Sequence, residues 1–165
     1  MDGVASNKKQ TKMLDVITIK GSDDMAIQLA SCCHPIPGDP ILGYINKEKG
    51  LVIHTHDCQI VNELSLDHDR WVDVEWEPDS EKLFNVRLSV LVVNERGMLG
   101  KIASVIADAE SNIDNVSLQD MDGSPFATLN FLVQVRHRQH LAELIRNLRK
   151  ITKVNKITRV KNYKS

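Results

Sequence analysis

Residues 84–109 read "FNVRLSVLVVNERGMLGKIASVIADA", and the spacing of apolar residues changes in the middle of this stretch. In residues 84–92 every second residue is apolar, which is typical of a strand buried on one face. In residues 99–109 the apolar residues recur at helical spacing. The stretch therefore predicts a strand, a turn and an amphipathic helix.

The residues that follow continue this alternation. We expect a strand at 113–121 and a return strand at 127–135, joined by Asp122-Gly123, a dipeptide typical of two-residue hairpins. Apolar residues within 141–148 have the spacing of a second amphipathic helix, and a last strand is expected at 154–160. The order β-α-β-β-α-β predicts a ferredoxin-like split sheet with both helices on one face.

The other face of this sheet is predicted to be apolar at Leu91, Val93 and Leu132. An exposed apolar face favours pairing with a second copy or docking on another module.

The N-terminal half is shorter and less regular. In chain order we expect a strand at 16–20, a short helix at 25–31, a hairpin of strands 41–45 and 51–54, a helix capped by Asp57, and a strand at 71–76.

The composition changes at "EWEPDSEK", residues 75–82, where Pro78 and its polar neighbours interrupt both patterns. We therefore expect an α+β chain with a small mixed α/β cysteine-containing module followed by the ferredoxin-like module. The predicted parts are a disordered segment at 1–15, the cysteine-containing module at 16–76, an acidic linker at 77–83 and the ferredoxin-like module at 84–162.

Charge is balanced over the whole chain, with 21 Lys and Arg against 22 Asp and Glu, but it is unevenly distributed. No acidic residue follows Glu143. The basic tail is either a solvated helix face and strand edge or a surface that contacts phosphates. Its candidate nucleic-acid contacts are Arg149, Lys150, Lys153, Lys156, Arg159 and Lys161.

No apolar run is long enough to span a bilayer, and the first residues lack the apolar core of a signal peptide. Three cysteines are an odd number, which fits a reducing compartment better than a disulfide framework. We expect a cytoplasmic protein without a membrane partner.

The three cysteines lie in two short motifs. "LASCCHPIPGDPILGY", residues 29–44, carries Cys32 and Cys33, and "HTHDC", residues 54–58, carries His54 and Cys58. Together these four residues would make a closed Cys₃His tetrahedron, which is typical of structural zinc. From the residues alone, two alternatives stay open: small buried core cysteines, and a redox or nucleophilic pair.

Other chemistry is disfavoured. The dipeptides His56-Asp57 and His68-Asp69 are found in metal-dependent phosphohydrolases, but such sites need several helices that this chain lacks. Phosphate-loop and dinucleotide fingerprints are absent, and residues 126–135 lack the stacking aromatics of an RNA-recognition motif.

Taken as a set, "CCHPIPGDPILGY", "KGLVIHTHDC" and "NERGMLGKI" resemble the C-terminal regulatory end of the RelA/SpoT family of (p)ppGpp synthetases/hydrolases. The resemblance covers residues 16–162. The second module is similar to ACT domains, whose loop pattern is Asp-Arg-x-Gly-x-Leu. Gly97 and Leu99 match that pattern, whereas Asn94 and Glu95 stand in place of Asp and Arg.

The resemblance implies a zinc-finger-like first domain with Cys32, Cys33, His54 and Cys58 as ligands, and His56 is a possible substitute for His54. It also implies an ACT loop at Asn94, Glu95, Arg96, Gly97, Met98 and Leu99 where a ligand could bind.

The function implied is that of a regulatory fragment that is not itself an enzyme, with hydrolase and synthetase domains upstream. Such a fragment would contact the ribosome and tRNA during starvation and control the catalytic domains of its own chain, and its ACT domain would form a homodimer. The alternative is an ACT dimer that senses a branched-chain amino acid.

Overall fold

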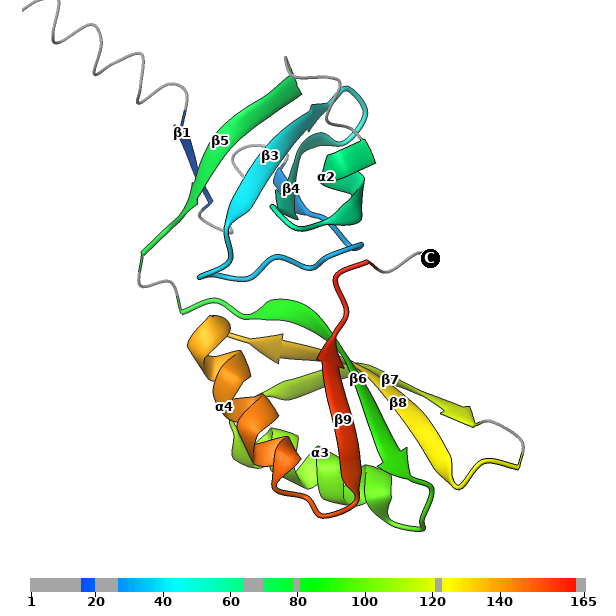
Figure 1. Cartoon of the computed structure of the whole chain (residues 1–165). Coiled ribbons are helices and arrows are strands. Elements are labelled where there is room, and N and C mark those ends of the chain that lie inside the picture. The colour runs from blue at the N-terminus through cyan, green and yellow to red at the C-terminus, as the bar shows by residue number, and fades with distance from the viewer. Residues whose placement is uncertain (1–15, 20–26, 64–69, 79–80, 121–122, 163–165) are drawn as a thin grey trace, which may run out of the picture.

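The computed structural model describes residues 16–19, 27–63, 70–78, 81–120 and 123–162. The predicted disordered segment at 1–15 and the predicted turn residue Asp122 lie outside these ranges. Two modules stand one above the other, a strand-rich upper one and a lower one with two long helices (Figure 1).

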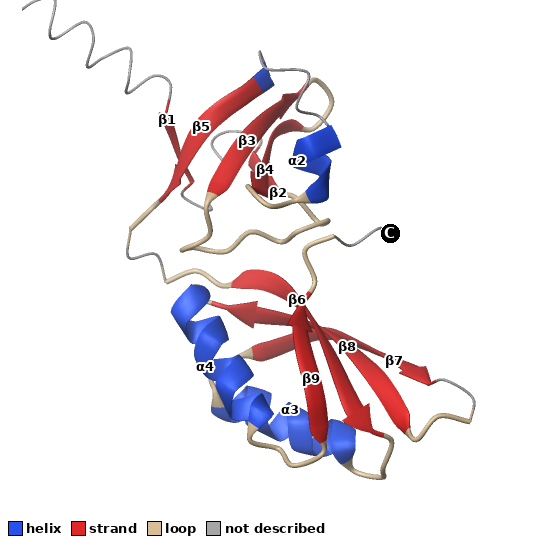
Figure 2. Cartoon of the chain, viewed as in Figure 1, coloured by secondary structure: helices blue, strands red, loops and turns tan. Residues whose placement is uncertain are grey.

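The upper module is a five-stranded sheet with the strand order β1-β5-β3-β4-β2. Strands β5, β3 and β4 are antiparallel, and the outer strands β1 and β2 pair parallel to β5 and β4. Figure 2 shows the short helix α2 beside it. Its elements are β1 (Val16–Ile19), β2 (Ile27–Leu29), β3 (Ile41–Asn46), β4 (Gly50–Thr55), α2 (Gln59–Glu63) and β5 (Trp71–Trp76).

The predicted hairpin and the predicted strand at 71–76 are confirmed. A small core of Ile41, Leu51, Ile53 and Val74 holds the sheet together. Residue 43, which is buried in this core, has room only for glycine, because a Cβ there would lie 2.9 Å from Leu51 Cδ1.

The predicted short helix at 25–31 is wrong for residues 27–31, and residues 25 and 26 lie outside the described ranges. Ile27–Leu29 forms β2, which pairs in register with β4 from Ile27 opposite Leu51 to Leu29 opposite Ile53. Met, Ala, Gln and Leu in this stretch favour a helix locally, but pairing with the edge of β4 outweighs that weak preference.

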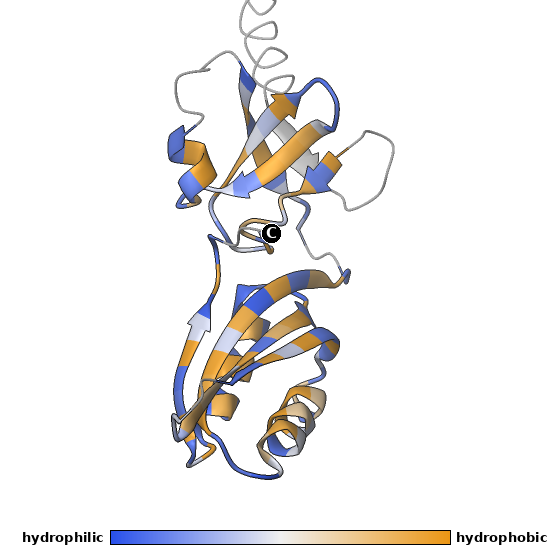
Figure 3. Ribbon diagram, turned by 90° about the vertical axis from the view of Figure 1, so that its right-hand side faces the viewer, coloured by the Kyte–Doolittle hydropathy of each residue, from blue (hydrophilic) through white to orange (hydrophobic). Residues whose placement is uncertain are grey.

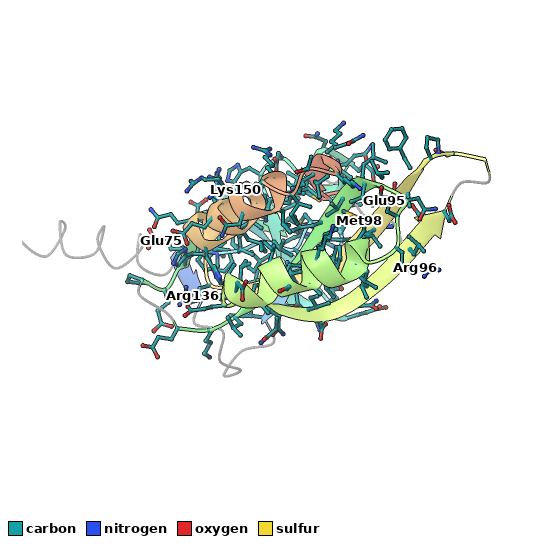
Figure 4. The ribbon with its side chains drawn as sticks, turned by 90° about the horizontal axis from the view of Figure 1, so that it is seen from below. Glu75, Glu95, Arg96, Met98, Arg136 and Lys150 are labelled. Atoms are coloured by element: carbon teal, nitrogen blue, oxygen red, sulfur yellow. The ribbon has the colours of Figure 1, made fainter. Side chains whose placement is uncertain are left out.

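The lower module has the predicted ferredoxin-like order, with a sheet arranged β7-β8-β6-β9. Helices α3 and α4 lie next to each other when the chain is seen from below (Figure 4). Its elements are β6 (Phe84–Val93), α3 (Met98–Asp108), β7 (Asn112–Asp120), β8 (Phe126–Val135), α4 (Arg138–Arg149) and β9 (Val154–Arg159).

Burial explains why this half follows its sequence pattern so closely. Residues alternate between buried and half-buried along all of β6, as the period-2 pattern predicts. Figure 3 shows this alternation as bands of orange and blue along the long strands of the lower module. Helix α3 buries Met98, Ile102 and Ile106 at helical spacing against the same core.

One detail differs from the predicted two-residue hairpin. Asp120 of β7 pairs with Ala127 of β8, so more than two residues separate the paired strands. Gly123 between them has a φ of 80°.

A loop of the upper module contributes directly to the core of the lower one. Ile36 is fully buried within the cluster that contains Phe84 and Leu144. Beside it, the Trp76 ring packs edge-on against Phe84 with ring centroids 5.4 Å apart. The two modules therefore share apolar packing as well as a chain connection.

Among the residues that the structure describes, none of the helices has the length and apolar content needed to cross a membrane.

Candidate metal centre

The four predicted ligands come together from three elements of the upper module. Cys32 and Cys33 lie in the turn after β2, His54 lies near the end of β4, and Cys58 directly precedes α2. Their ligand atoms all lie within 4.8 Å of one another. Ligands of two motifs, each at least 21 positions from those of the other motif, thus form one cluster.

Four of the six distances between ligand atoms lie close to the edges of a tetrahedral zinc site. Cys32 Sγ lies 3.9 Å from Cys33 Sγ and 3.5 Å from Cys58 Sγ. The His54 Nδ1 atom lies 3.5 Å from Cys32 Sγ and 3.9 Å from Cys33 Sγ. Zn–S bonds of about 2.3 Å and Zn–N bonds of about 2.0–2.1 Å imply tetrahedron edges of about 3.8 Å between sulfurs and about 3.6 Å from sulfur to nitrogen.

Burial sets the protonation of these groups. It raises the pKa of the Cys32 thiol, with the neighbouring Cys33 adding to the effect, and it raises the pKa of Cys33 to about 11. Burial also lowers the pKa of His54. Without a metal, the thiols of Cys32 and Cys33 are therefore neutral, and a bound Zn²⁺ would displace their protons.

A zinc ion held by these four residues would be structural. Three sulfurs and one nitrogen fill the tetrahedral shell, so no position is left for water or substrate. The Thr55 backbone N–H donates to Cys33 Sγ at 3.4 Å and would orient that ligand. The ion would join the turn after β2 to the start of α2.

The structure distinguishes between the two candidate histidines. His54 is buried and belongs to the cluster, whereas the side chain of His56 is exposed. His54 lies on β4, which ends at Thr55, whereas His56 lies in the turn that follows, so the two side chains do not share a strand face. The predicted capping of this helix by Asp57 is wrong, because α2 begins at Gln59, directly after Cys58. The Gln59 N–H donates to Asn162 Oδ1 at 3.1 Å, and the Asp57 carboxylate accepts from Lys161 Nζ at 2.9 Å.

The loop after Cys33 forms a charged junction with the lower module, which the sequence did not reveal. Arg159 on β9 donates from Nη1 and Nη2 to the two carboxylate oxygens of Asp39, at 2.9 and 2.6 Å. The same Nη2 donates to the carbonyl oxygen of His34 at 3.0 Å. Asp39 Oδ2 also accepts from the Ile36 N–H at 2.9 Å, and Arg138 on α4 approaches Oδ1 at 3.7 Å.

The junction is buried and has a well-defined backbone. The side chains of Asp39 and Arg159 are only 2% and 12% exposed. Trp76 Nε1 donates to the Asp39 carbonyl oxygen at 3.0 Å, and Gly38 has a φ of 100°, a value that favours glycine. In the sequence, the only sign of this junction was Asp39, the acid in "PIPGDP" that follows the cysteines.

The six predicted nucleic-acid contacts divide into two groups. Arg149 and Lys150 at the end of α4 and Lys156 on β9 are exposed. The other three make ion pairs within the chain: Lys153 with Glu95, Lys161 with Asp57, and Arg159 with Asp39.

The predicted ACT loop borders a cavity of about 280 Å³ between the start of α3 and the strands β7 and β8. Gly97 has a φ of 86° at the N-terminus of α3, as its place in the loop pattern requires. Glu95, Arg96 and Met98 lie around this turn (Figure 4). Met98 is buried, whereas Leu99 is 46% exposed at the rim.

Asn94, at the start of the loop, donates from Nδ2 to Asp120 Oδ1 at 3.2 Å. The carboxylate of Glu95 is held by Lys153.

Comparison with known proteins agrees with this architecture. Residues 17–77 match the RelA/SpoT RIS domain, and residues 80–159 match the ACT domain. The bifunctional (p)ppGpp synthase/hydrolase SpoT of Escherichia coli K12 is 33% identical over 146 residues, which are 88% of this chain and 21% of that protein. The GTP pyrophosphokinase of Streptomyces coelicolor is 31% identical over 79% of this chain and 15% of its own length.

Among solved structures, the crystal structure of the ACT domain from the GTP pyrophosphokinase of Chlorobium tepidum is 26% identical. The matched region is 47% of this chain and 99% of that structure, with a TM-score of 0.41.

The chain is therefore a regulatory module made of a RIS domain followed by an ACT domain. It belongs to the RelA/SpoT family and corresponds to the C-terminal regulatory region of these (p)ppGpp enzymes, which confirms the resemblance. It spans about a fifth of the length of the first relative named above.

Proposed function

We propose that this region regulates a (p)ppGpp synthetase/hydrolase in the cytoplasm without catalysing a reaction itself. Contacts with the ribosome and tRNA would report starvation, and the region would bias catalytic domains elsewhere in the same chain. The family membership supports this proposal, because the relatives carry out alarmone synthesis or hydrolysis and this chain matches a small part of them.

The observation that carries the proposal is the loop at 33–39. Its first residue, Cys33, belongs to the metal cluster, and its last, Asp39, is bound by Arg159 of the ACT domain. Ile36 between them is buried in the ACT core. A ligand that displaces one domain would therefore displace the other, which is what transmission of a signal along the chain requires.

The nucleic-acid contact is supported by the exposed cations Arg149, Lys150 and Lys156. They lie at the end of α4 and on the neighbouring β9, in a part of the chain without acidic residues. Cations arranged in this way bind the phosphate backbone of RNA without reading its sequence. Because Lys153, Arg159 and Lys161 are engaged in ion pairs, the proposed contact surface consists of the three exposed cations.

Cosedimentation with ribosomes tests this proposal. The triple variant Arg149→Glu, Lys150→Glu, Lys156→Glu should bind more weakly, and the slope of log affinity against log salt should decrease by about 2–3. The triple variant Lys47→Glu, Lys49→Glu, Arg70→Glu makes the same charge change at exposed positions of the RIS domain and should bind as wild type. Unchanged binding by the first triple variant would refute the contact surface.

We also propose that two chains pair through the ACT domain. Leu91, Val93 and Leu132, the residues of the expected apolar outer face, are half-buried in the single chain. Three apolar side chains are more exposed: Leu99 on α3, and Val116 and Leu118 on β7. Their exposed fractions are 46%, 37% and 58%. Strand β7 is also an edge of its sheet, so a second copy could extend the sheet there.

An ACT dimer that senses a branched-chain amino acid is not favoured. The relatives named above are (p)ppGpp enzymes. The carboxylate at the rim of the ACT cavity, Glu95, is already bound by Lys153.

A further inference from the structure

The three sulfurs of the metal cluster differ in their access to solvent. Cys33 and Cys58 are both fully buried, whereas Cys32 is only partly buried. A cavity of about 700 Å³ beside the cluster is lined by Cys32 and His54. A small molecule that enters this cavity reaches Cys32 before the other two sulfurs.

Cations predominate among the described residues at the rim of this cavity. In that part of the chain Lys47, Lys49 and Arg70 line it together with one acid, Glu48. Partly exposed sulfur in electropositive surroundings is the setting in which cysteine reacts readily. Metal coordination would add to this, because a zinc-bound cysteine is a thiolate, and the thiolate is the nucleophile.

The geometry also selects the partner for Cys32. Its Sγ lies 3.5 Å from Cys58 Sγ, the shorter of its two sulfur contacts. Cys33 is its neighbour in sequence, so their Cα atoms are about 3.8 Å apart, below the range of about 4.4–6.8 Å that ordinary disulfides need. Oxidation of Cys32 should therefore lead to a bond with Cys58.

We propose that Cys32 is an oxidation site at which a hydroperoxide, with hydrogen peroxide as the simplest example, converts the metal centre into a Cys32–Cys58 disulfide. This inference rests on the metal centre described above and goes beyond the proposed regulation by ribosome contact.

The reaction has two steps. The Cys32 thiolate attacks one peroxide oxygen, an S–O bond forms, the O–O bond breaks and hydroxide leaves, which gives a sulfenic acid. The Cys58 thiolate then attacks this sulfur, the S–S bond forms, the S–O bond breaks and a second hydroxide leaves. The two thiolates lose two electrons and the peroxide gains them.

Zinc has no redox chemistry of its own and would lose two of its four ligands, so it would be released. The release would reach the junction with the ACT domain. Cys33 loses its metal anchor, and this residue begins the loop whose other end, Asp39, is held by Arg159. Loss of zinc should loosen that loop and its contact with the ACT domain.

The experiment uses the zinc-loaded chain. Hydrogen peroxide should release about one zinc ion per chain, measured with a chromogenic chelator, while two thiols are lost. Fragmentation mass spectrometry should find Cys32 bonded to Cys58, and dithiothreitol with added zinc should restore both zinc and thiols. In a separate sample, limiting maleimide should label Cys32 first.

Two matched variants separate the partners. Each variant loses a zinc ligand, so only its thiol products are compared, over a longer oxidation than for wild type. Cys33→Ser should still form the bond, whereas Cys58→Ser should not and should instead give a dimedone adduct at Cys32. If either variant fails to fold, the disulfide located by mass spectrometry in the wild-type chain still identifies the partner of Cys32. A bond between Cys33 and Cys58, first labelling at Cys33 or Cys58, or zinc retained while thiols are lost would overturn the inference.

The metal content measured before oxidation tests the metal centre itself. A chain that never binds zinc refutes both the centre and this inference, whereas ribosome cosedimentation tests the proposed function independently.

Discussion

Arg159 and Asp39, 120 residues apart in the sequence, form a bidentate ion pair that is almost wholly buried between the RIS and ACT domains. A buried pair of this kind contributes orientation more than net stability, but removal of one partner leaves an uncompensated charge away from water. Because the carboxylate also accepts the Ile36 N–H, the pair fixes the loop that follows the metal ligands.

Removal of the Asp39 charge should destabilise the whole chain. Asp39→Asn keeps the shape of the side chain and leaves the Arg159 guanidinium buried without a counter-charge. The free energy of unfolding in urea should decrease by about 3–5 kcal/mol. Asp57→Asn is the matched control, because its pair with Lys161 is exposed and should be worth less than about 1 kcal/mol. Equal effects of the two substitutions would contradict a buried junction.

Metal binding should depend on His54 and not on His56. Elemental analysis should find about one zinc ion per wild-type chain and a similar content in His56→Ala. His54→Ala should lose the metal, as should treatment with a strong chelator. Loss of the zinc should lower the free energy of unfolding by several kcal/mol. For a chain of this size, that corresponds to a decrease in the thermal midpoint on the order of 10 °C. A His54→Ala chain that keeps zinc with wild-type affinity would remove this residue from the ligand set.

The stability of the metal-free chain should depend on pH in two separate ranges. Burial lowers the pKa of His34 and His54 below 6.5, so below pH 6.5 the unfolded chain binds protons that the folded chain does not. Stability should therefore fall as pH decreases through that value.

At alkaline pH the sign is reversed. The pKa of Cys33 is raised from 9.0 to about 11, and burial also raises that of Cys32, so above pH 9.0 the unfolded chain loses thiol protons that the folded chain retains. Stability should then fall as pH increases. Urea unfolding in the presence of a chelator and a reductant measures the stability in both pH ranges. Zinc should abolish the decrease in stability at alkaline pH, because bound thiolates stabilise the folded chain. If zinc leaves that decrease unchanged, the result would contradict thiolate ligation.

Dimerisation should depend on the apolar patch of β7. Leu118→Asp places a charge where a partner chain would bury an apolar surface, so the dimer dissociation constant should increase at least about tenfold. Sedimentation equilibrium measures this constant. Ile45→Asp, at a residue of the RIS domain with 46% exposure, is the control and should leave it unchanged. A dimer equally sensitive to both substitutions would place the interface elsewhere.

Much of the ACT fold could be predicted because its pattern is local. The alternation in β6 and the helical spacing in α3 each repeat over several periods, so a single shift would expose many apolar side chains. In the RIS domain β2 is three residues long, too short for a period, and its conformation depends on the edge of β4 that it joins.

The sequence by itself determined the types of group that could act: three thiols and three histidines in two motifs, and cations concentrated in the tail. Only the tertiary structure decided which of them meet. It turned His54 inward and His56 outward, and it placed Arg159 against Asp39 while Lys156 stayed exposed. The physical reason is that ligation and ion pairing require atoms within a few ångströms. For residues distant in sequence, that proximity is set by the packing of strands and domains rather than by any local pattern.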